Sequence, residues 1–591
     1  MSRTTPGSAL SRGLAGRTDL DQYKHSKRLL FAAQVILGID DIHVVAKDAL
    51  TDGSGDRSCD FLYVDRDSAT ILLAQAYEAT VKQEVAAKKV HSLYEAVDWV
   101  LSQQLRGLPM VLESAIEQAR AALRDGEIRH FKIWFVHNLK NQPQIHEALN
   151  GAGEAARNAL DARFKDVADN VVVEVLEVSD ECLSEWYAGY ASVIDVKDDL
   201  VLPWKGGQRI VGPGWEAAQT VVPLKWLADQ FWAFRQRLFS ANVRDYLGRM
   251  NSPNNINQGI RTTLEEEPEN FFVYNNGVTA LTEEFEIIRG LDDEELLILK
   301  GLSIVNGAQT TGVLQGSDGL ALDDAQVSIR FIMCENRQII NKIIRFNNRQ
   351  NSVSIGDYRS NDPVQGRLAK EFKALGIRTY RKIRRGGSRD AIRRTDPAAI
   401  LATYAARALV AFHGDPVIAH FNPAWIWEEK SMYRRYFCED LSARHLIICW
   451  GLAKSLERLK QGLRAAAKLS DGRRKQLDFL DRQGSIWLAT SAIAACSDDL
   501  APGLKSSKFD LELADPANGE LAIALWDPIV QKVIPYAPTC LEALLSKGGR
   551  WKDADLNEAI HTFRAAVAPM LESEDNLRDS FAHAVRVRAR R

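Results

Sequence analysis

The alternation of apolar and polar positions in the first third of the chain predicts strands and helices in turn. Two short apolar runs are separated by polar residues 65–68, a composition that favours a turn, so they predict a β-hairpin. Longer stretches repeat their apolar residues at helical spacing. The predicted strands are 61–64, 69–74, 131–136 and 171–176, and the predicted helices are 22–37, 80–124 and 147–164. Such alternation is typical of a mixed sheet covered by helices.

A second region, about 220–450, has more strand-like runs flanked by helices. Its predicted strands are 271–274, 296–299, 303–305 and 327–333. Residues 195–223 contain several glycines and short apolar runs, which indicates a connector or a small β element. From residue 451 onward Ala and Leu recur at helical spacing. The pattern predicts an α/β multidomain protein divided as 1–195, 196–450 (α+β) and 451–591 (all-helical).

Composition narrows the class of protein. The chain has 591 residues, enough for roughly four domains at about 150 residues each. It is 46% hydrophobic and 26% charged, as expected of a globular protein. With 75 Lys+Arg against 78 Asp+Glu, the net charge of -3 excludes a uniformly basic surface but not a local basic patch. No apolar run approaches the roughly 20 residues of a membrane helix, and no signal peptide is evident, so we expect a cytoplasmic protein without a membrane partner.

The cysteines and histidines lack the spacings typical of zinc sites. The seven cysteines form no Cys-x-x-Cys pair, and no His-x-x-x-His spacing exists. The scattered His413, His420 and His445 argue against catalytic zinc. The odd count and wide spacing of the cysteines argue against structural zinc and favour buried thiols in a reducing cytoplasm. The motifs of phosphate-binding ATPases and of serine hydrolases are also absent from the sequence.

Three clusters rich in Asn and Gly follow predicted elements of the second region. One follows the run 271–274, one follows 303–305, and one follows a helical stretch at 337–346. Amide side chains both donate and accept hydrogen bonds, so clusters that converge would offer a site for a phosphate, ribose or base. Each cluster alone is more typical of a turn. The predicted ligand-binding residues are Asn275, Asn276, Gly277, Asn306, Gly307, Gln309, Thr310, Asn347, Asn348 and Gln350.

In this order, the clusters resemble the AIPR family of abortive-infection phage-resistance proteins. The resemblance covers about 220–420 and rests on the segments 238–248 (LFSANVRDYLG), 268–279 (PENFFVYNNGVT), 304–310 (IVNGAQT), 346–351 (FNNRQN) and 380–382 (YRK). It implies bacterial defence against phage, ending in growth arrest or death of the host. The resemblance leaves two kinds of assembly open. One is a complex with a protein partner from a defence operon, and the other is a homo-oligomer.

The same order of segments is also similar to ParB-like and Asp-Gly-Gln-His-Arg domains, which bind nucleotides or regulate DNA modification. In this chain Asn306 replaces the acidic residue of that pattern and Thr310 replaces its arginine, so nucleotide hydrolysis is not expected. This likeness implies the alternative function, a non-catalytic nucleotide-binding sensor or scaffold that controls a separate effector.

AIPR proteins often carry an N-terminal restriction-endonuclease-like domain, and the resemblance implies one in residues 1–195. Its chemistry needs oxygen ligands for Mg²⁺ on two strands of a hairpin and a lysine two residues after the second ligand. Asp60 and Gln75 fit the metal ligands, but Tyr77 stands where the lysine is expected. The predicted catalytic residues are Asp60, Gln75, Glu78 and Lys82. The alternative is a hairpin that keeps the fold without the reaction, and Tyr77 favours it.

A strongly basic segment lies near the end of the resemblance. Eight Lys or Arg residues fall within the seventeen residues 378–394, and Asp390 alone opposes them. Such a segment neutralises phosphates, and Tyr380 would stack on a base, although runs of charge are commonly solvated surface. The predicted contacts to DNA or RNA are Arg378, Tyr380, Arg381, Lys382, Arg384, Arg385 and Arg389. The sequence therefore predicts phage defence through nucleic-acid binding, with metal-dependent cleavage if the hairpin is active.

Overall fold

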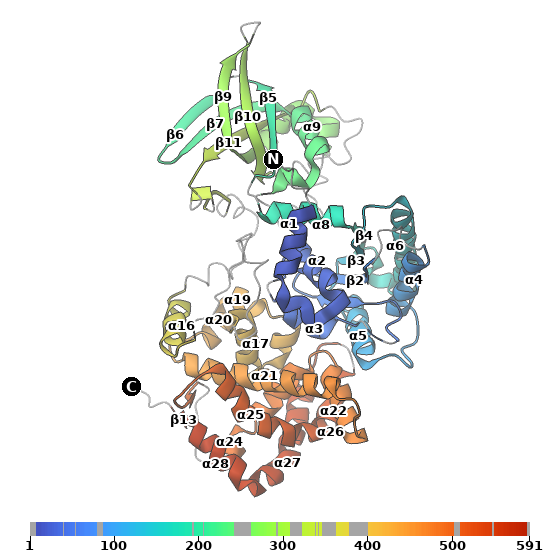
Figure 1. Cartoon of the computed structure of the whole chain (residues 1–591), viewed down its shortest axis with the longest axis vertical. Helices are drawn as coiled ribbons and strands as arrows, with labels where there is room; N and C mark the ends of the chain where they lie inside the picture. The colour runs from blue at the N-terminus through green and yellow to red at the C-terminus, as the bar shows by residue number, and fades with distance from the viewer. Residues whose placement is uncertain are drawn as a thin grey trace.

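A computed structural model of the chain places a β-rich domain at one end, a helical region at the other, and the N-terminal domain between them (Figure 1). The structure describes residues 7–39, 41–51, 53, 55–79, 87–191, 194–204, 206–240, 262–290, 294–307, 322–336, 339–340, 342–344, 362–377, 400–501, 509–546 and 549–587. Within those residues, no helix has both the length and the apolar character needed to cross a membrane.

The N-terminal domain is a four-stranded mixed sheet with helices on both faces, as predicted. Its strands, in spatial order, are β1 (Phe61–Asp65), β2 (Thr70–Tyr77), β3 (His130–His137) and β4 (Val172–Val178). The first pair is the antiparallel hairpin and the next two pairings are parallel. Along β2, Ile71 and Leu73 face one hydrophobic core whereas Leu72 and Ala74 face another, because side chains alternate along a strand.

Two groups of helices supply these two cores. The first core is covered by α4 (Ala87–Leu101), α5 (Met110–Arg124) and α6 (Pro143–Arg163). The second is covered by α1 (Gly7–Gly16), α2 (Lys27–Leu37), α3 (Ile42–Ala49) and α8 (Asp180–Ala191), with the short α7 (Lys165–Ala168) after α6. The single helix predicted over 80–124 is wrong. The chain breaks between α4 and α5, where Gly107 has a φ of +72° and Pro109 precedes the new helix.

The second domain is built on a seven-stranded sheet. Its strands are β5 (Val196–Pro203), β6 (Gln208–Gly212), β7 (Trp215–Pro223), β8 (Val278–Thr282), β9 (Glu284–Arg289), β10 (Glu295–Asn306) and β11 (Gln326–Cys334). The order is β5-β10-β8-β11-β7-β6, and β9 also pairs with β10. Residues 195–223 thus contribute three strands rather than a connector, and α9 (Leu224–Phe234) packs into the core of this domain.

Two strand predictions in this domain need correction. Residues 271–274 form one helical turn, α12 (Phe271–Tyr274), after the 3-10 turn η3 (Pro268–Asn270). Phe271 is buried but the next three residues are exposed, so the run lacks the alternation between core and solvent of a strand. The two strands predicted at 296–299 and 303–305 are one strand, β10, with an irregularity at Gly301, where φ is +74°.

The other α-helices of the described residues share one large hydrophobic core. They are α16 (Pro363–Ala374), α17 (Ala402–Phe412), α18 (Pro416–Phe421), α19 (Trp425–Glu428), α20 (Lys430–Tyr436), α21 (Ala443–Ala465), α22 (Asp471–Asp481), α23 (Ser485–Ala494), α24 (Ser497–Leu500), α25 (Gly519–Val533), α26 (Ala537–Leu545), α27 (Asp553–Ser573) and α28 (Asp575–Ala584). The C-terminal region is helical as predicted, except for a ribbon of β12 (Leu511–Leu513) and β13 (Val585–Val587). The core runs from Leu368 to Val585 and so spans the predicted boundary at 450.

The N-terminal domain packs against this helical region through polar contacts. Lys47 of α3, which is partly buried, forms an ion pair with the buried Glu457 of α21. Arg482 reaches Glu117 of α5 at 3.2 Å, and the backbone N–H of Gln483 donates to the Ser114 hydroxyl at 2.9 Å. Contacts far apart in sequence therefore hold the two ends of the chain together.

Candidate functional site

Two of the three Asn–Gly clusters meet at one edge of the seven-stranded sheet. Strand β8 begins at Val278, immediately after Gly277, and its antiparallel neighbour β10 ends at Asn306. Asn306 pairs with Thr279, and a Cβ atom at Gly307 would lie 2.8 Å from Cγ2 of Val278. The clusters at 275–277 and 306–307 are thus adjacent. Their positions at the ends of predicted elements suggested that they would converge.

Glycine is required at both clusters by the backbone. Gly277 has a φ of +79° and Gly307 a φ of +107°, a region that side chains rarely adopt. A Cβ atom at Gly277 would lie 2.6 Å from the carbonyl oxygen of Ser328 on β11. The two glycines therefore let β8, β10 and β11 approach closely at this edge.

Asn275 and Asn306 each form a hydrogen bond within these turns, and the two bonds differ in kind. The Oδ1 atom of Asn306 accepts a hydrogen bond from the Gly307 N–H at 2.9 Å. The Nδ2 group of Asn275 donates to the Phe271 carbonyl at 3.1 Å and closes the turn of α12. Asn276 is exposed. Turn chemistry thus accounts for one hydrogen bond of Asn275 and one of Asn306, while the exposed Asn276 is accessible to a ligand.

A cation that is not among the predicted binding residues lies beside these clusters. Arg330 of β11 pairs with Thr279 of β8, and its Nη2 group donates to the Thr279 hydroxyl at 3.2 Å. Asn306, Thr279 and Arg330 therefore form one row across three neighbouring strands. The available signal in the sequence was an arginine within the apolar run 327–333, and the structure shows that it is exposed. A guanidinium beside exposed amides is a favourable partner for a phosphate.

The other predicted binding residues lie outside the described part of the chain. This applies to Gln309, Thr310, Asn347, Asn348 and Gln350, and to the whole basic segment from Arg378 to Arg394. Their roles stay predictions. The basic segment begins shortly after α16, whose last residue is Ala374.

Asp60 and Gln75 lie next to each other at the end of the N-terminal hairpin. Phe61 pairs with Ala74, so Asp60 and Gln75 occupy the next position along the two strands. The Oδ2 atom of Asp60 accepts a hydrogen bond of 2.6 Å from the Ala76 N–H. Gln75 is 3% exposed, and its Nε2 group donates to the Ser92 hydroxyl of α4 at 2.8 Å. Both side chains thus have structural hydrogen bonds within the fold.

Glu78 is directed to the opposite face of this sheet from Gln75. It forms an ion pair of 3.3 Å with Arg28 of α2, which also contacts Asp180 of α8 at 2.7 Å. These helices cover the second core, whereas Ser92 belongs to the helices of the first. The structure therefore brings Asp60 and Gln75 together but places Glu78 elsewhere, and Lys82 lies outside the described residues.

A cluster suited to a metal occurs in the helical region instead. His413, His445 and Cys449 have ligand atoms that all lie within 4.8 Å of one another, and the described residues contain no other such group of three His, Cys, Asp or Glu side chains. The three side chains match no motif made of two histidines or two cysteines, so from the sequence alone the histidines are interpreted as scattered. The spacing of His445 and Cys449, four residues apart on α21, was the available signal, since it places both on one helix face.

Comparison with known proteins identifies the family. The model of the family described as AIPR protein matches residues 239–511, which include the edge formed by β8, β10 and β11 as well as the His–His–Cys cluster. No curated protein and no solved structure matches the chain. Residues 239–511 of this chain belong to the AIPR family.

Proposed function

We propose that this protein acts in bacterial anti-phage defence by abortive infection, and that it does so by binding nucleic acid at the edge where β8, β10 and β11 meet. The match to the AIPR family is consistent with the defence role. The observation that supports the site is the convergence of the clusters at 275–277 and 306–307 beside Arg330.

The chemistry of this edge suits a phosphate. Gly277 and Gly307 let Ser328 and Val278 pack directly against the backbone, which holds the ends of β8, β10 and β11 close together. Arg330 supplies a permanent positive charge with several donors in a fixed geometry. The exposed amide of Asn276 adds a donor for a phosphate or a base edge. The basic segment 378–394, in the same family region, adds charge that would track a nucleic-acid backbone.

The experiment is binding of labelled single- and double-stranded DNA and RNA of equal length, measured by fluorescence anisotropy at several salt concentrations. Arg330→Gln removes the charge but keeps a side-chain amide near Thr279. Arg289→Gln is the matched control, because Arg289 is also an exposed arginine on a strand of this sheet. It lies opposite Glu295 in the pairing of β9 with β10, at the far end of β10 from Asn306. We expect Arg330→Gln to weaken binding and to reduce the salt slope by about one, and Arg289→Gln to leave both unchanged. Equal behaviour of the two variants would contradict the proposed site.

The second candidate is a sensor or scaffold that binds a nucleotide at the same edge and catalyses nothing itself. The contacts of the hairpin favour it, because Asp60 and Gln75 are engaged by Ala76 and Ser92, and Tyr77 takes the position of the expected lysine. In this case a protein partner from a defence operon, or a second copy of the chain, would carry the effector.

A competition experiment separates the two candidates. Mononucleotides that displace a bound oligonucleotide at micromolar concentrations, through a site lost in Arg330→Gln, would support the sensor. Oligonucleotide binding that mononucleotides do not disturb would support nucleic acid as the ligand.

A further inference from the structure

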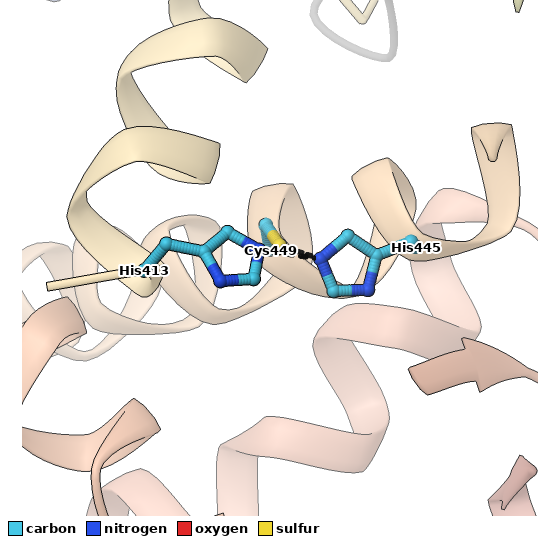
Figure 2. Close-up of side chains that lie close together, drawn as sticks. All are labelled: His413, His445 and Cys449. Carbon is cyan, nitrogen blue, oxygen red and sulfur yellow. Dashed lines mark hydrogen bonds between the residues drawn. The ribbon is translucent and has the colours of Figure 1, made fainter. Parts of the chain in front are cut away.

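Three side chains that bind soft metal ions meet where α17 ends against α21. His413 follows Phe412, the last residue of α17, while His445 and Cys449 lie one turn apart on α21 (Figure 2). The Nε2 atoms of His413 and His445 are 2.8 Å apart, and the Cys449 sulfur lies 3.4 Å from Nε2 of His445. His445 and Cys449 are fully buried, and His413 is partly exposed.

The tautomer of His445 is set by the backbone. Its Nδ1 group lies 2.7 Å from the Leu511 carbonyl oxygen, which can only accept, so Nδ1 carries the proton. The lone pair of the neutral ring is therefore on Nε2, which faces the other two side chains. A ring nitrogen that donates to a carbonyl while the other nitrogen points into a cluster is the usual arrangement of a histidine that binds a metal.

Two groups approach the same hydrogen-bond acceptor in this cluster. Nε2 of His445 has one lone pair, yet both the His413 ring nitrogen and the Cys449 thiol approach it. A cation at the centre would engage all three groups at once. In a tetrahedral zinc site, neighbouring ligand atoms are about 3.3 Å apart for two nitrogens and about 3.6 Å apart for nitrogen and sulfur. The two histidine nitrogens would reach this separation by moving apart about half an ångström, and the His445–Cys449 pair is already within about 0.2 Å of it. The ligand atoms of His413 and Cys449 lie within 4.8 Å of each other.

We propose that His413, His445 and Cys449 bind one Zn²⁺ ion, with a water molecule as the fourth ligand. Two imidazoles and one thiolate suit zinc, whereas Mg²⁺ and Ca²⁺ require oxygen ligands. Cys449 loses its thiol proton to solvent when the ion binds, because the thiolate is the ligand. Of the three side chains, His413 is the one that solvent reaches.

A bound ion would lie among aromatic side chains of the helical core. Phe412 and Phe509 lie against the histidine rings, with the Phe509 and His413 ring centroids 4.7 Å apart. Such an apolar shell strengthens the attraction between the ion and the thiolate. The ion would join α17 to α21 and, through the Leu511 carbonyl, to β12, where the family match ends.

The test uses the full-length protein and two buried cysteines of the same core. The protein is stripped with a chelator, reloaded with Zn²⁺ or Co²⁺ and dialysed, and its metal content is measured by mass spectrometry. Cobalt also reports its ligands, since a thiolate gives a charge-transfer absorption band and tetrahedral geometry gives intense visible bands. The variants are Cys449→Ala and, as the matched control, Cys496→Ala, which is equally buried.

We expect one metal ion per chain and a thiolate band in the wild type and in Cys496→Ala, and loss of the band with at least tenfold weaker binding in Cys449→Ala. If Cys449→Ala does not fold, His413→Gln serves instead, because its partly exposed side chain tolerates the change; it should lower the affinity by a similar factor. A wild-type protein that retains no metal after loading would overturn the proposal, as would a band that survives in Cys449→Ala.

Discussion

Gly277 lies so close to Ser328 that a Cβ atom at position 277 would stand 2.6 Å from the Ser328 carbonyl oxygen. This contact fixes the start of β8 against β11, its parallel neighbour. Because Asn276 precedes Gly277 and Arg330 lies two residues beyond Ser328, the same contact determines how the amide and the guanidinium of the proposed site are placed. The site therefore depends on a glycine that itself contributes no side chain.

Replacement of Gly277 by alanine should destabilise the protein by about 2–4 kcal/mol, from the left-handed backbone together with the clash. Gly376→Ala is the control, because Gly376 has a similar φ of +76° but nothing within 4 Å of an added Cβ. It should cost only about 1 kcal/mol. Denaturant unfolding of both variants measures the difference, and equal losses would show that the contact with Ser328 is unimportant.

The N-terminal sheet was predictable because each of its strands is a short apolar run bounded by turn residues. The run 271–274 misled for a physical reason, since four consecutive apolar residues have no periodicity that separates a strand from a helical turn. For residues 195–223 only a connector or a small β element was predicted, because glycines interrupt the three strands that form there.

For the candidate site, the sequence indicated that the clusters at 275–277 and 306–307 would converge, since both lie at element ends. It could not reveal that Arg330 joins them, because that depends on the parallel pairing of β8 with β11. The His413–His445 contact was hidden for the same reason, since it joins two helices whose packing no local pattern specifies.

The ion pair between Lys47 and Glu457 should make the stability of the domain interface depend on acid pH. Burial alone would raise the pKa of the Glu457 carboxyl, but the charges and hydrogen bonds of Lys454 and Lys47 outweigh it and lower the pKa from 4.5 to about 2. The unfolded chain therefore takes up this proton first, so stability is present above pH 4.5 and is lost as the pH falls towards 2.

Glu457→Gln should remove this pH dependence and cost about 2 kcal/mol near neutral pH, because the partly buried Lys47 and Lys454 lose their shared charge partner. Unfolding measured from pH 7 to pH 3 tests both effects. Asp229→Asn, which breaks the exposed pair with Lys225, should change stability by less than about 0.5 kcal/mol. A Glu457→Gln variant as stable as Asp229→Asn would refute the role given to this ion pair.

The basic segment should contribute charge rather than sequence recognition. Changing Arg381, Arg384 and Arg385 to Ala together should weaken binding of all oligonucleotides alike and lower the salt slope by about two to three. Anisotropy titrations across several salt concentrations measure the slope. A slope that stays at the wild-type value would mean that the phosphate contacts lie elsewhere.

The N-terminal hairpin should not cleave nucleic acid, because Tyr77 cannot supply the charge of the expected lysine. Incubation of labelled DNA and RNA with the protein and Mg²⁺ tests this. Asp60→Asn is the informative variant, since its amide oxygen still accepts from the Ala76 N–H, and stability should change by less than about 1 kcal/mol. Mg²⁺-dependent cleavage by the wild type that disappears in Asp60→Asn would show an active nuclease.

Phage plating on cells that express the protein tests the central claim most directly. The comparison needs three variants at matched protein levels: Asp60→Asn in the hairpin, and Arg330→Gln and Asn306→Asp at the sheet edge. Asn306→Asp keeps the acceptor for the Gly307 N–H but adds a negative charge that repels phosphate. We expect Asp60→Asn to protect as well as the wild type and both edge variants to lose protection. Protection lost in Asp60→Asn but retained in the two edge variants would contradict the account.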